Sequence, residues 1–284
     1  MGQTIQKLLQ NVTEYAIMQE GTSVTQKQNG NLLILAKAYE PYVDCSLDSY
    51  YLCSQDLYHT ARQLVACLQE SGARAEIAGD LHYKWLAGES GIAGVRGLNG
   101  LAISHTMGCY FALQVVRTDA DVTVQLGDGH LVRMPRQYEW CIDCNRCVEA
   151  CPTGAIGADG SFDCDKCIRQ HMGKPQESLA MFDHIGTRFL GCDECRKVCP
   201  HNDKVARIHA PKHIIDLVDN ALFAYKGLEP WIGSNLARAK IVYNQAIIVA
   251  ANQGDTDKIE RIKMLGREEN FAVNAKIALH KLRK

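Results

Sequence analysis

The spacing of the cysteines between Cys141 and Pro152 constrains this chain more than any other feature of its sequence. In the stretch CIDCNRCVEACPTGAI, three cysteines recur at every third residue, and a fourth, Cys151, follows after a gap of four and directly precedes Pro152. A C-x-x-C-x-x-C run can wrap one face of a cubane iron–sulfur cluster and supply three of its four thiolates. The first three cysteines therefore predict a 4Fe-4S cluster whose fourth ligand lies elsewhere in the chain.

The out-of-step Cys151 predicts a second cluster, because in two-cluster ferredoxins the cysteine before the proline ligates the other cluster. The chain supplies the required second group in FDCDKC and GCDECRKVCPHN. Zinc also accepts C-x-x-C pairs, but zinc knuckles require neither two Cys-Pro endings nor a C-x-x-C-x-x-C run. In the exchange that we predict, one 4Fe-4S cluster takes Cys141, Cys144, Cys147 and Cys199, and the other takes Cys151, Cys192, Cys195 and either Cys164 or Cys167.

The remaining composition indicates a globular, cytoplasmic protein that does not contact a membrane. Hydrophobic residues make up 46% of the 284 residues, enough for one sizeable core or two smaller ones. No apolar run approaches the roughly 18 residues of a membrane-spanning helix. Thirteen cysteines fit a reducing compartment, where thiolates serve as metal ligands. The scattered cysteines are expected to fill core space as small hydrophobes, and they are Cys45, Cys53, Cys67 and Cys109.

Helical and strand periods alternate before the cysteine motifs, and helical periods alone follow them. Helices are expected over 4–19, 54–72 and 82–91, and strands over 31–39, 74–78, 100–104, 111–116 and 122–126. After the motifs, helices are expected over 213–227, 235–254, 255–266 and 269–284. The last two resemble one helical-repeat hairpin.

These elements predict an α+β chain in three parts. An α/β cofactor-binding domain is expected at 1–135, a ferredoxin-like two-cluster module at 136–205 and a helical C-terminal region at 206–284. The sequence contains no P-loop, no Rossmann glycine fingerprint after a strand and no G-x-S-x-G motif. Reducing power is therefore expected to arrive through the clusters, from an external donor of the ferredoxin or flavodoxin type.

The order of three motifs resembles the epoxyqueuosine reductases and, more distantly, the reductive dehalogenases. The motifs are DLYHTARQL, then SGIAGVRGLNGLAISHTMGCYFALQVVRTD, then the two Cys-Pro motifs ending in GCDECRKVCPHN. The resemblance implies a nitroreductase-like α/β domain that holds cobalamin, a two-cluster ferredoxin module, and C-terminal helical repeats.

The resemblance also implies roles for individual residues. The segment KCIRQ matches the family with Cys167 as the ligand, which leaves Cys164 as a spare thiol. Asp80 is the carboxylate ahead of the glycine turn that would correspond to the family's proton donor, and a helix-capping role is the alternative. Packing is the alternative for the Tyr-His pair in the first motif. The implied cofactor-binding residues are Tyr58, His59, Arg62, Arg96, Gly97, Asn99, Gly100 and Ser104.

Two functions follow from these observations. In the first, the protein is a cobalamin-dependent oxidoreductase in which electrons pass from two 4Fe-4S clusters to a corrinoid and on to a substrate, which the resemblance suggests is a modified base in tRNA. In the second, it is an electron-transfer protein or a reductive activator of a separate corrinoid protein. Cobalt content separates the two. The basic end KIALHKLRK could contact tRNA phosphates, or could be a solvated terminal helix.

Overall fold

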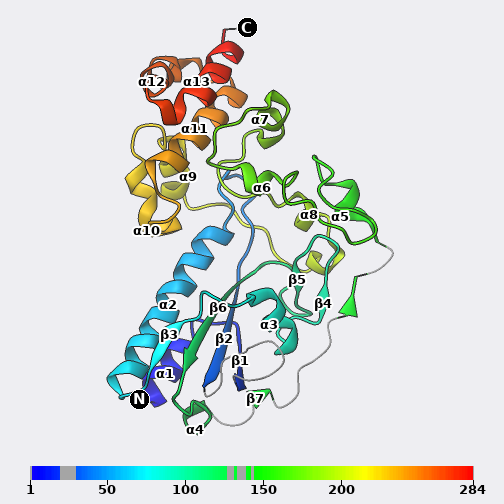
Figure 1. Ribbon diagram of the computed structural model, residues 1–284, viewed down its shortest axis with the longest axis vertical. Helices are drawn as coiled ribbons and strands as arrows, with labels where there is room; N and C mark the ends of the chain where they lie inside the picture. The colour runs from blue at the N-terminus through cyan, green and yellow to red at the C-terminus, as the bar shows by residue number, and fades with distance from the viewer. Residues whose placement is uncertain (1, 20–29, 127–130, 133–138, 142–143, 284) are drawn as a thin grey trace. The chain divides into compact units, whose positions relative to one another are not determined.

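The computed structural model describes residues 2–19, 30–126, 131–132, 139–141 and 144–283. Helices and strands both occur, which confirms the predicted mixture of α and β structure (Figure 1). Contacts between Cα atoms divide the chain into two compact units, and each unit draws on three segments. Unit 1 comprises Met1–Tyr39, Cys53–Asn145 and Cys199–Val205, and unit 2 comprises Glu40–Leu52, Arg146–Val198 and Ala206–Lys284. The three-part division, the nitroreductase-like architecture and the helical-repeat hairpin stay predictions.

Unit 1 is built on a five-stranded sheet with the order β3-β6-β2-β1-β7. The central strand β2 (Asn31–Ala38) pairs antiparallel with β1 (Glu14–Gln19) and with β6 (Phe111–Thr118). The side chains from Leu32 to Ala36 are all fully buried, which explains five successive apolar residues in place of an alternating pattern. The outer strands are β3 (Ala75–Ile77), antiparallel to β6, and β7 (Leu131–Val132), parallel to β1.

Side chains of helix α2 (Tyr50–Glu70) bind to β2 and to the turn that follows α1 (Gly2–Leu9). Its buried face carries leucines at helical spacing, as the sequence predicted. On its polar side, Asn11 Nδ2 donates to Thr60 Oγ1 at 2.8 Å, and Lys37 on β2 forms an ion pair with Asp56. The polar contacts therefore fix α2 along the strand that forms the middle of the sheet.

A second, three-stranded sheet of unit 1 has the order β5-β4-β8. Its strands are β4 (Val95–Arg96), β5 (Ala102–Ile103) and β8 (Glu139–Trp140). Helix α3 (Tyr83–Glu89) packs against β5 and β6 with Leu86 and Ala87 buried. The glycine turn between β4 and β5 is therefore placed beside α3.

Within unit 1, two expectations from sequence periodicity are wrong. Residues 4–19 were expected to form one helix, but α1 ends at Leu9 and the chain continues as β1, because pairing with β2 outweighs a helical period. Residues 122–126 were expected to form a strand, but they contain the short helix α4 (Thr123–Leu126). Asp121 Oδ1 accepts the Thr123 N–H at 3.1 Å, which favours the start of a helix.

Unit 2 consists of helices and loops. The segment 213–227 was expected to be one helix and is instead divided between a helix at Lys212–Asp219 and a 3-10 helix at Tyr225–Leu228. The cysteine region contains α5 (Arg146–Glu149), α6 (Ile168–His171), α7 (Leu179–Ile185) and α8 (Glu194–Lys197). The C-terminal part contains α9 (Lys212–Asp219), η3 (Tyr225–Leu228), α10 (Glu229–Ile232), α11 (Ala239–Gln253), η4 (Thr256–Lys258), α12 (Ile259–Leu265) and α13 (Glu269–Lys281).

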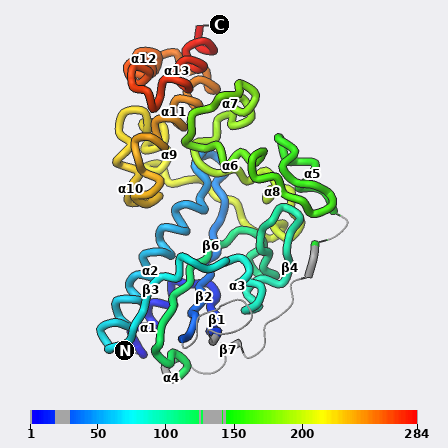
Figure 2. The backbone as a smooth tube through the Cα atoms, in the orientation of Figure 1, coloured from blue at the N-terminus to red at the C-terminus, as the bar shows by residue number. Residues whose placement is uncertain are grey.

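Helix α11 forms the core of the C-terminal part. It is buried almost continuously from Val242 to Ala251, and it contacts α7 and α13. The backbone trace in Figure 2 shows α11, α12 and α13 packed side by side. Among the described residues, no helix is both long enough and apolar enough to cross a membrane.

Buried amide side chains join α11 and α13 to the loop after α6. Asn274 on α13 has no exposed surface; its Oδ1 accepts the Gln176 N–H at 2.8 Å, and its Nδ2 donates to Asn244 Oδ1 at 2.9 Å. Gln245 Oε1 accepts the Gly173 N–H at 2.7 Å. Buried polar groups persist when they are hydrogen-bonded in this way, so the network fixes the register of both helices against this loop.

We expect Asn274→Ala to lower the free energy of unfolding by about 1–3 kcal/mol, because it leaves the buried Gln176 N–H and Asn244 carbonyl without partners. Anaerobic urea denaturation measures the loss. The matched control is Asn220→Ala, which removes an exposed amide bonded to Asp216 O in α9 and should cost less than about 0.5 kcal/mol. Equal losses in the two variants would contradict this role for the network.

Candidate functional site

Three of the predicted ligands of the first cluster lie together in unit 1. Cys199 and Cys141 pack in one small cluster with Val95 and Ile103. The Cys141 N–H donates to Arg96 O at 3.0 Å, which fixes the start of the cysteine motif on β4. Burial raises the pKa of Cys141, and the negative charges of Cys199 and Cys144 raise it further. Thiolates that repel one another in this way are suited to share a cationic iron–sulfur core.

Cys199 has a further sulfur contact that the sequence did not predict. Cys109 was expected to fill core space, and it is buried, but its Sγ also donates a hydrogen bond to Cys199 Sγ at 3.9 Å. This bond lowers the pKa of Cys199 to about 7 against the opposing effect of burial. No local sequence signal marks the contact, because it joins residues from distant parts of the chain.

A second group of predicted ligands lies in unit 2. Burial raises the pKa of Cys195 to about 12, and Cys192, Cys147 and Cys167 add to the increase. Helices α5 and α8, which carry Cys147 and Cys195, are in contact. Cys147 is thus beside cysteines that were assigned to the other cluster, and the ligand assignment stays a prediction.

Two further cysteines of unit 2 differ in their surroundings. Cys151 Sγ accepts the Ala155 N–H at 3.3 Å, and backbone amides at Thr153 and Ala155 lower the pKa of Cys151 although burial opposes them. Cys164 is exposed, whereas Cys167 is half-buried at the start of α6. An exposed Cys164 is compatible with a spare thiol.

Four thiolates can hold either one metal ion or a cubane cluster. Tetrahedral zinc would hold four thiolates about 2.3 Å from one ion. In the described part of the chain, no three His, Cys, Asp or Glu side chains converge closely enough for that. A cubane core is larger and holds its thiolates farther apart, with iron and sulfide between them.

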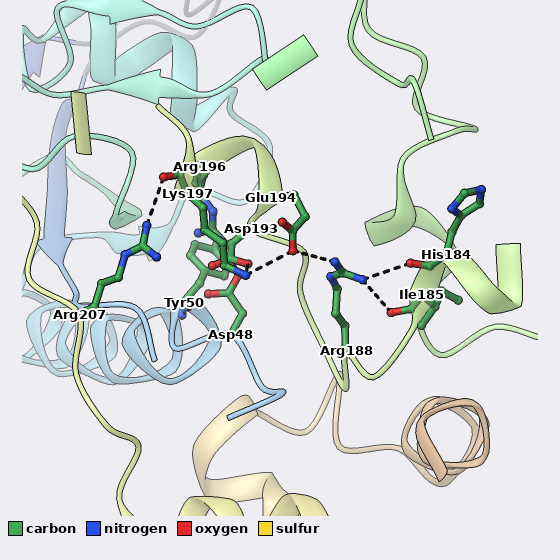
Figure 3. Close-up of polar contacts among 10 residues, drawn as sticks. All are labelled: Asp48, Tyr50, His184, Ile185, Arg188, Asp193, Glu194, Arg196, Lys197 and Arg207. Atoms are coloured by element: carbon green, nitrogen blue, oxygen red, sulfur yellow. Dashed lines mark hydrogen bonds and ion pairs between the residues drawn. The ribbon is translucent and has the colours of Figure 1, made fainter. Parts of the chain in front are cut away.

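A buried ion pair supports the turn from Cys192 to Cys195. Arg196 Nη2 bonds to Asp48 Oδ2, and their side chains are only 4% and 7% exposed (Figure 3). Leu47 forms a parallel β-bridge with Leu190, and a Cβ atom added at Gly191 would lie 2.3 Å from Asp48 Cβ. The segment before α2 therefore lies directly against the second cysteine group, and this approach requires glycine at position 191.

Charged residues around the same turn pair with one another. Arg188 Nη2 bonds to Glu194 Oε1 at 2.7 Å while its Nη1 donates to the carbonyls of His184 and Ile185 (Figure 3). Lys197 Nζ lies 3.0 Å from Asp193 Oδ1. Each carboxylate in the C-D-E-C segment thus has a cationic partner, which limits the negative charge beside the thiolates.

The glycine turn of unit 1 adjoins a cavity of about 260 Å³. Gly100 has φ +70°, and no atom lies within 4 Å of a Cβ built there, while its carbonyl accepts a hydrogen bond from Lys84 Nζ at 3.0 Å. Asn99 Oδ1 accepts the Leu101 N–H at 3.2 Å, and a Cβ at Gly97 would clash with this side chain. The cavity is lined by His82, Lys84, Trp85, Arg96, Gly100, Leu101 and Ala102. Sequence reasoning selected Arg96 and Gly100 but missed the three residues from the start of α3.

The other predicted cofactor residues do not line this cavity. On α2, the Tyr58 and His59 rings lie 6.1 Å apart, and His59 Nε2 is 2.9 Å from Gln55 Nε2. Arg62 is exposed on the same helix. Ser104 is buried, and its Oγ lies 3.0 Å from Thr106 Oγ1 within its own turn.

Two carboxyl groups lie near α3. Asp80 is half-exposed, and its two oxygens accept from Arg117 Nη2 at 3.1 and 3.2 Å. Glu89, at the end of α3, is only 9% exposed, and its Oε2 has no hydrogen-bond partner in the described part of the chain. Burial raises the pKa of Glu89. Only Asp80 was selected from the sequence.

Comparison with known proteins extends these observations. The family model described as a 4Fe-4S double cluster binding domain matches residues 140–202. Among curated proteins, the chain is 33% identical over 120 residues to an epoxyqueuosine reductase of Francisella cf. novicida, covering 42% of this chain and 31% of that protein. It is 27% identical over 217 residues to that of Lactococcus garvieae, covering 66% and 58%. The chain spans less than two thirds of the length of each of these relatives.

Solved structures show the same fold. The epoxyqueuosine reductase from Bacillus subtilis superposes with a TM-score of 0.71 at 18% identity, covering 97% of this chain and 88% of that one. The enzyme from Streptococcus thermophilus gives a TM-score of 0.70 at 20% identity, covering 99% and 90%. The resemblance seen in the sequence is confirmed: the chain is related to the epoxyqueuosine reductases and carries a 4Fe-4S double cluster binding domain.

Proposed function

We propose that this chain is an iron–sulfur reductase of the epoxyqueuosine reductase type. The observation that carries the proposal is the combination of a double cluster domain at 140–202 with an α/β unit whose glycine turn faces an open, cationic cavity. Electrons would enter the clusters from an external ferredoxin or flavodoxin and leave toward this cavity. Thiolate clusters of this kind fit a reducing compartment, so we propose a cytoplasmic location.

The clusters would use the exchanged ligand sets. One would be held by Cys141, Cys144, Cys147 and Cys199, and the other by Cys151, Cys167, Cys192 and Cys195. The mutual charge effects among Cys141, Cys144 and Cys199 support the first set. The effects of Cys192 and Cys167 on Cys195 support the second, although Cys147 of the first set acts on Cys195 in the same direction.

Cobalamin is the cofactor that the relationship implies, and the chemical types of the residues around the glycine turn suit it. Backbone without side chains at Gly100 permits close approach of a flat macrocycle, while Lys84 and Arg96 suit its phosphate and amide groups. Arg96, Gly97, Asn99 and Gly100 would hold it, with Ser104 stabilising the adjacent turn. The helix residues Tyr58, His59 and Arg62 are assigned to the same domain by resemblance alone. When bound, a corrinoid supplies a strongly reducing centre for the substrate.

The proton for the reduction would come from a carboxyl group of this domain. Asp80 is the donor that the resemblance implies, but its paired hydrogen bonds from Arg117 stabilise the carboxylate. Glu89 retains its proton more readily because it is buried. We therefore propose Glu89 as a second candidate donor.

The substrate would be a modified base in tRNA. A related epoxyqueuosine reductase has been solved with an epoxyqueuosine-modified tRNA stem loop, at a TM-score of 0.67 and 19% identity. In this chain, α13 and the two residues that follow it carry exposed basic side chains at Lys276, His280 and Arg283. Such a cluster can contact phosphates without reading sequence.

The spare-thiol assignment predicts opposite results for two neighbouring cysteines. Cys164→Ala should keep the full iron content, because Cys164 is exposed and outside the ligand set. Cys167→Ala should lose one cluster. Iron and sulfide analysis of anaerobically purified protein measures both. Loss of iron in Cys164→Ala with retention in Cys167→Ala would reverse the assignment.

Cobalamin binding predicts a saturable change in the visible spectrum of cobalamin added to the anaerobic protein. Gly100→Ala should weaken this binding, because its added methyl group enters the open space beside the turn. Gly72→Ala is the matched control: Gly72 also has a positive φ with no atom near a Cβ, but it follows α2. A spectrum unchanged at saturating cobalamin would remove the reductase proposal and favour the electron-transfer alternative.

Phosphate contacts at the C-terminal helix predict a salt-dependent loss of tRNA binding. Replacing Lys276 and Arg283 by alanine should weaken stem-loop binding several-fold and reduce the slope of log K against log salt by about 1 per lost contact. The control replaces Lys212 and Lys226 by alanine. Both lysines are exposed, so the control variant loses the same positive charge from another part of the surface. Identical isotherms for the two double variants would exclude this helix from the interface.

A further inference from the structure

Cys109 is placed against a predicted cluster ligand by the fold of unit 1. It lies two residues before the first residue of β6 and is 5% exposed. Its Sγ is 3.9 Å from Cys199 Sγ. Both belong to the small apolar cluster that contains Val95 and Ile103, with Cys141 packed against it. The Cys109 thiol is therefore shielded from water on the side where Cys199 lies.

Backbone contacts hold the two cysteines at this separation. The Cys109 N–H donates to Asn202 Oδ1 at 2.7 Å, and the Asn202 N–H donates to Cys199 O at 2.9 Å. Gly108 has φ +58°, and a Cβ added there would lie 2.1 Å from Asn202 Oδ1. The turn before Cys109 therefore packs closely against the turn after Cys199, with the Asn202 side chain between them.

Cys109 is better suited to donate to a ligand than to act as one. Thiolates on different corners of a cubane have iron and sulfide between them, whereas these two sulfur atoms are in direct contact. The predicted set of Cys141, Cys144, Cys147 and Cys199 already fills four corners. A thiol is a weak hydrogen-bond donor, and a cluster thiolate is a negatively charged acceptor for it.

We propose that Cys109 is a positioning residue that donates an S–H···S hydrogen bond to the Cys199 thiolate and raises the reduction potential of that cluster. The inference rests on the proposed clusters. Reduction adds negative charge that spreads onto the ligand sulfurs, so a donor stabilises the reduced cluster more than the oxidised one. Cys109 would make the cluster held by Cys199 a better electron acceptor.

The test is an anaerobic redox titration of the full chain followed by electron paramagnetic resonance. Cys109→Ala should shift the equilibrium for reduction of one cluster toward the oxidised form by up to about tenfold, which is ~59 mV for a one-electron couple. The other cluster should not shift. Cys109→Ser keeps a donor at this position and should restore much of the potential.

Cys53→Ala is the matched control. Cys53 is another buried thiol of unit 1, but its Sγ lies 3.4 Å from Lys37 O, so its loss should change neither potential. Iron content should equal that of the unaltered chain in all three variants. The Cys109 N–H bond to Asn202 is a backbone contact that each substitution at 109 retains.

Three outcomes would overturn the inference. Full iron content with an unchanged potential in Cys109→Ala would show that the thiol does not influence the cluster. Loss of a cluster in that variant would make Cys109 a ligand. An equal shift in Cys109→Ser would assign the effect to packing. Absence of iron–sulfur signals from the unaltered chain would instead refute the proposed function.

Discussion

The ion pair between Asp48 and Arg196 is the contact on which the cysteine-bearing part of unit 2 depends. Both side chains are less than a tenth exposed, so removing either partner would leave an uncompensated buried charge, at a cost of about 3–5 kcal/mol. Arg196 directly follows Cys195, and Asp48 Oδ1 also accepts the Tyr50 N–H at 3.0 Å where α2 begins. One carboxylate therefore stabilises both a helix start and the turn that presents two thiols.

The amide network and the ion pair act on opposite ends of the same loop region. After Cys167, Gln245 accepts the Gly173 N–H and Asn274 accepts the Gln176 N–H. After Cys195, Asp48 binds the side chain of Arg196. Between these points the loop carries α7, whose Ser178 side chain accepts the Met181 N–H. The C-terminal helices thus restrict the conformations available to the cysteine motifs, which supports a structural role for them beside any contact with tRNA.

The local spacing of the cysteines made part of this site predictable from the sequence. The rest depends on contacts between residues that are far apart in the sequence, which no local pattern reveals. The offset of Cys151 indicated two clusters because ligand geometry is encoded within a few residues. The apolar run over 31–39 indicated a buried strand because that pattern is also local, and Leu32 to Ala36 are fully buried. The contact of Cys109 with Cys199 spans 90 residues, and the pairing of Asp80 with Arg117 depends on where β6 lies. Residues 122–126 formed a helix because Asp121 accepts an amide at its start, which outweighed their β-branched composition.

The segments that make up unit 1 have a consequence for biosynthesis. Its last segment, Cys199–Val205, is separated from the preceding one by most of the cysteine region. During translation, Cys109 and Cys141 would therefore leave the ribosome well before the segment Cys199–Val205. Unit 1 can complete its packing only when that last segment has been synthesised. In the proposed ligand set, the cluster that includes Cys141 would therefore be completed only after the Cys199 turn has been synthesised. A genetic fusion that carried only the first 145 residues would lack that turn.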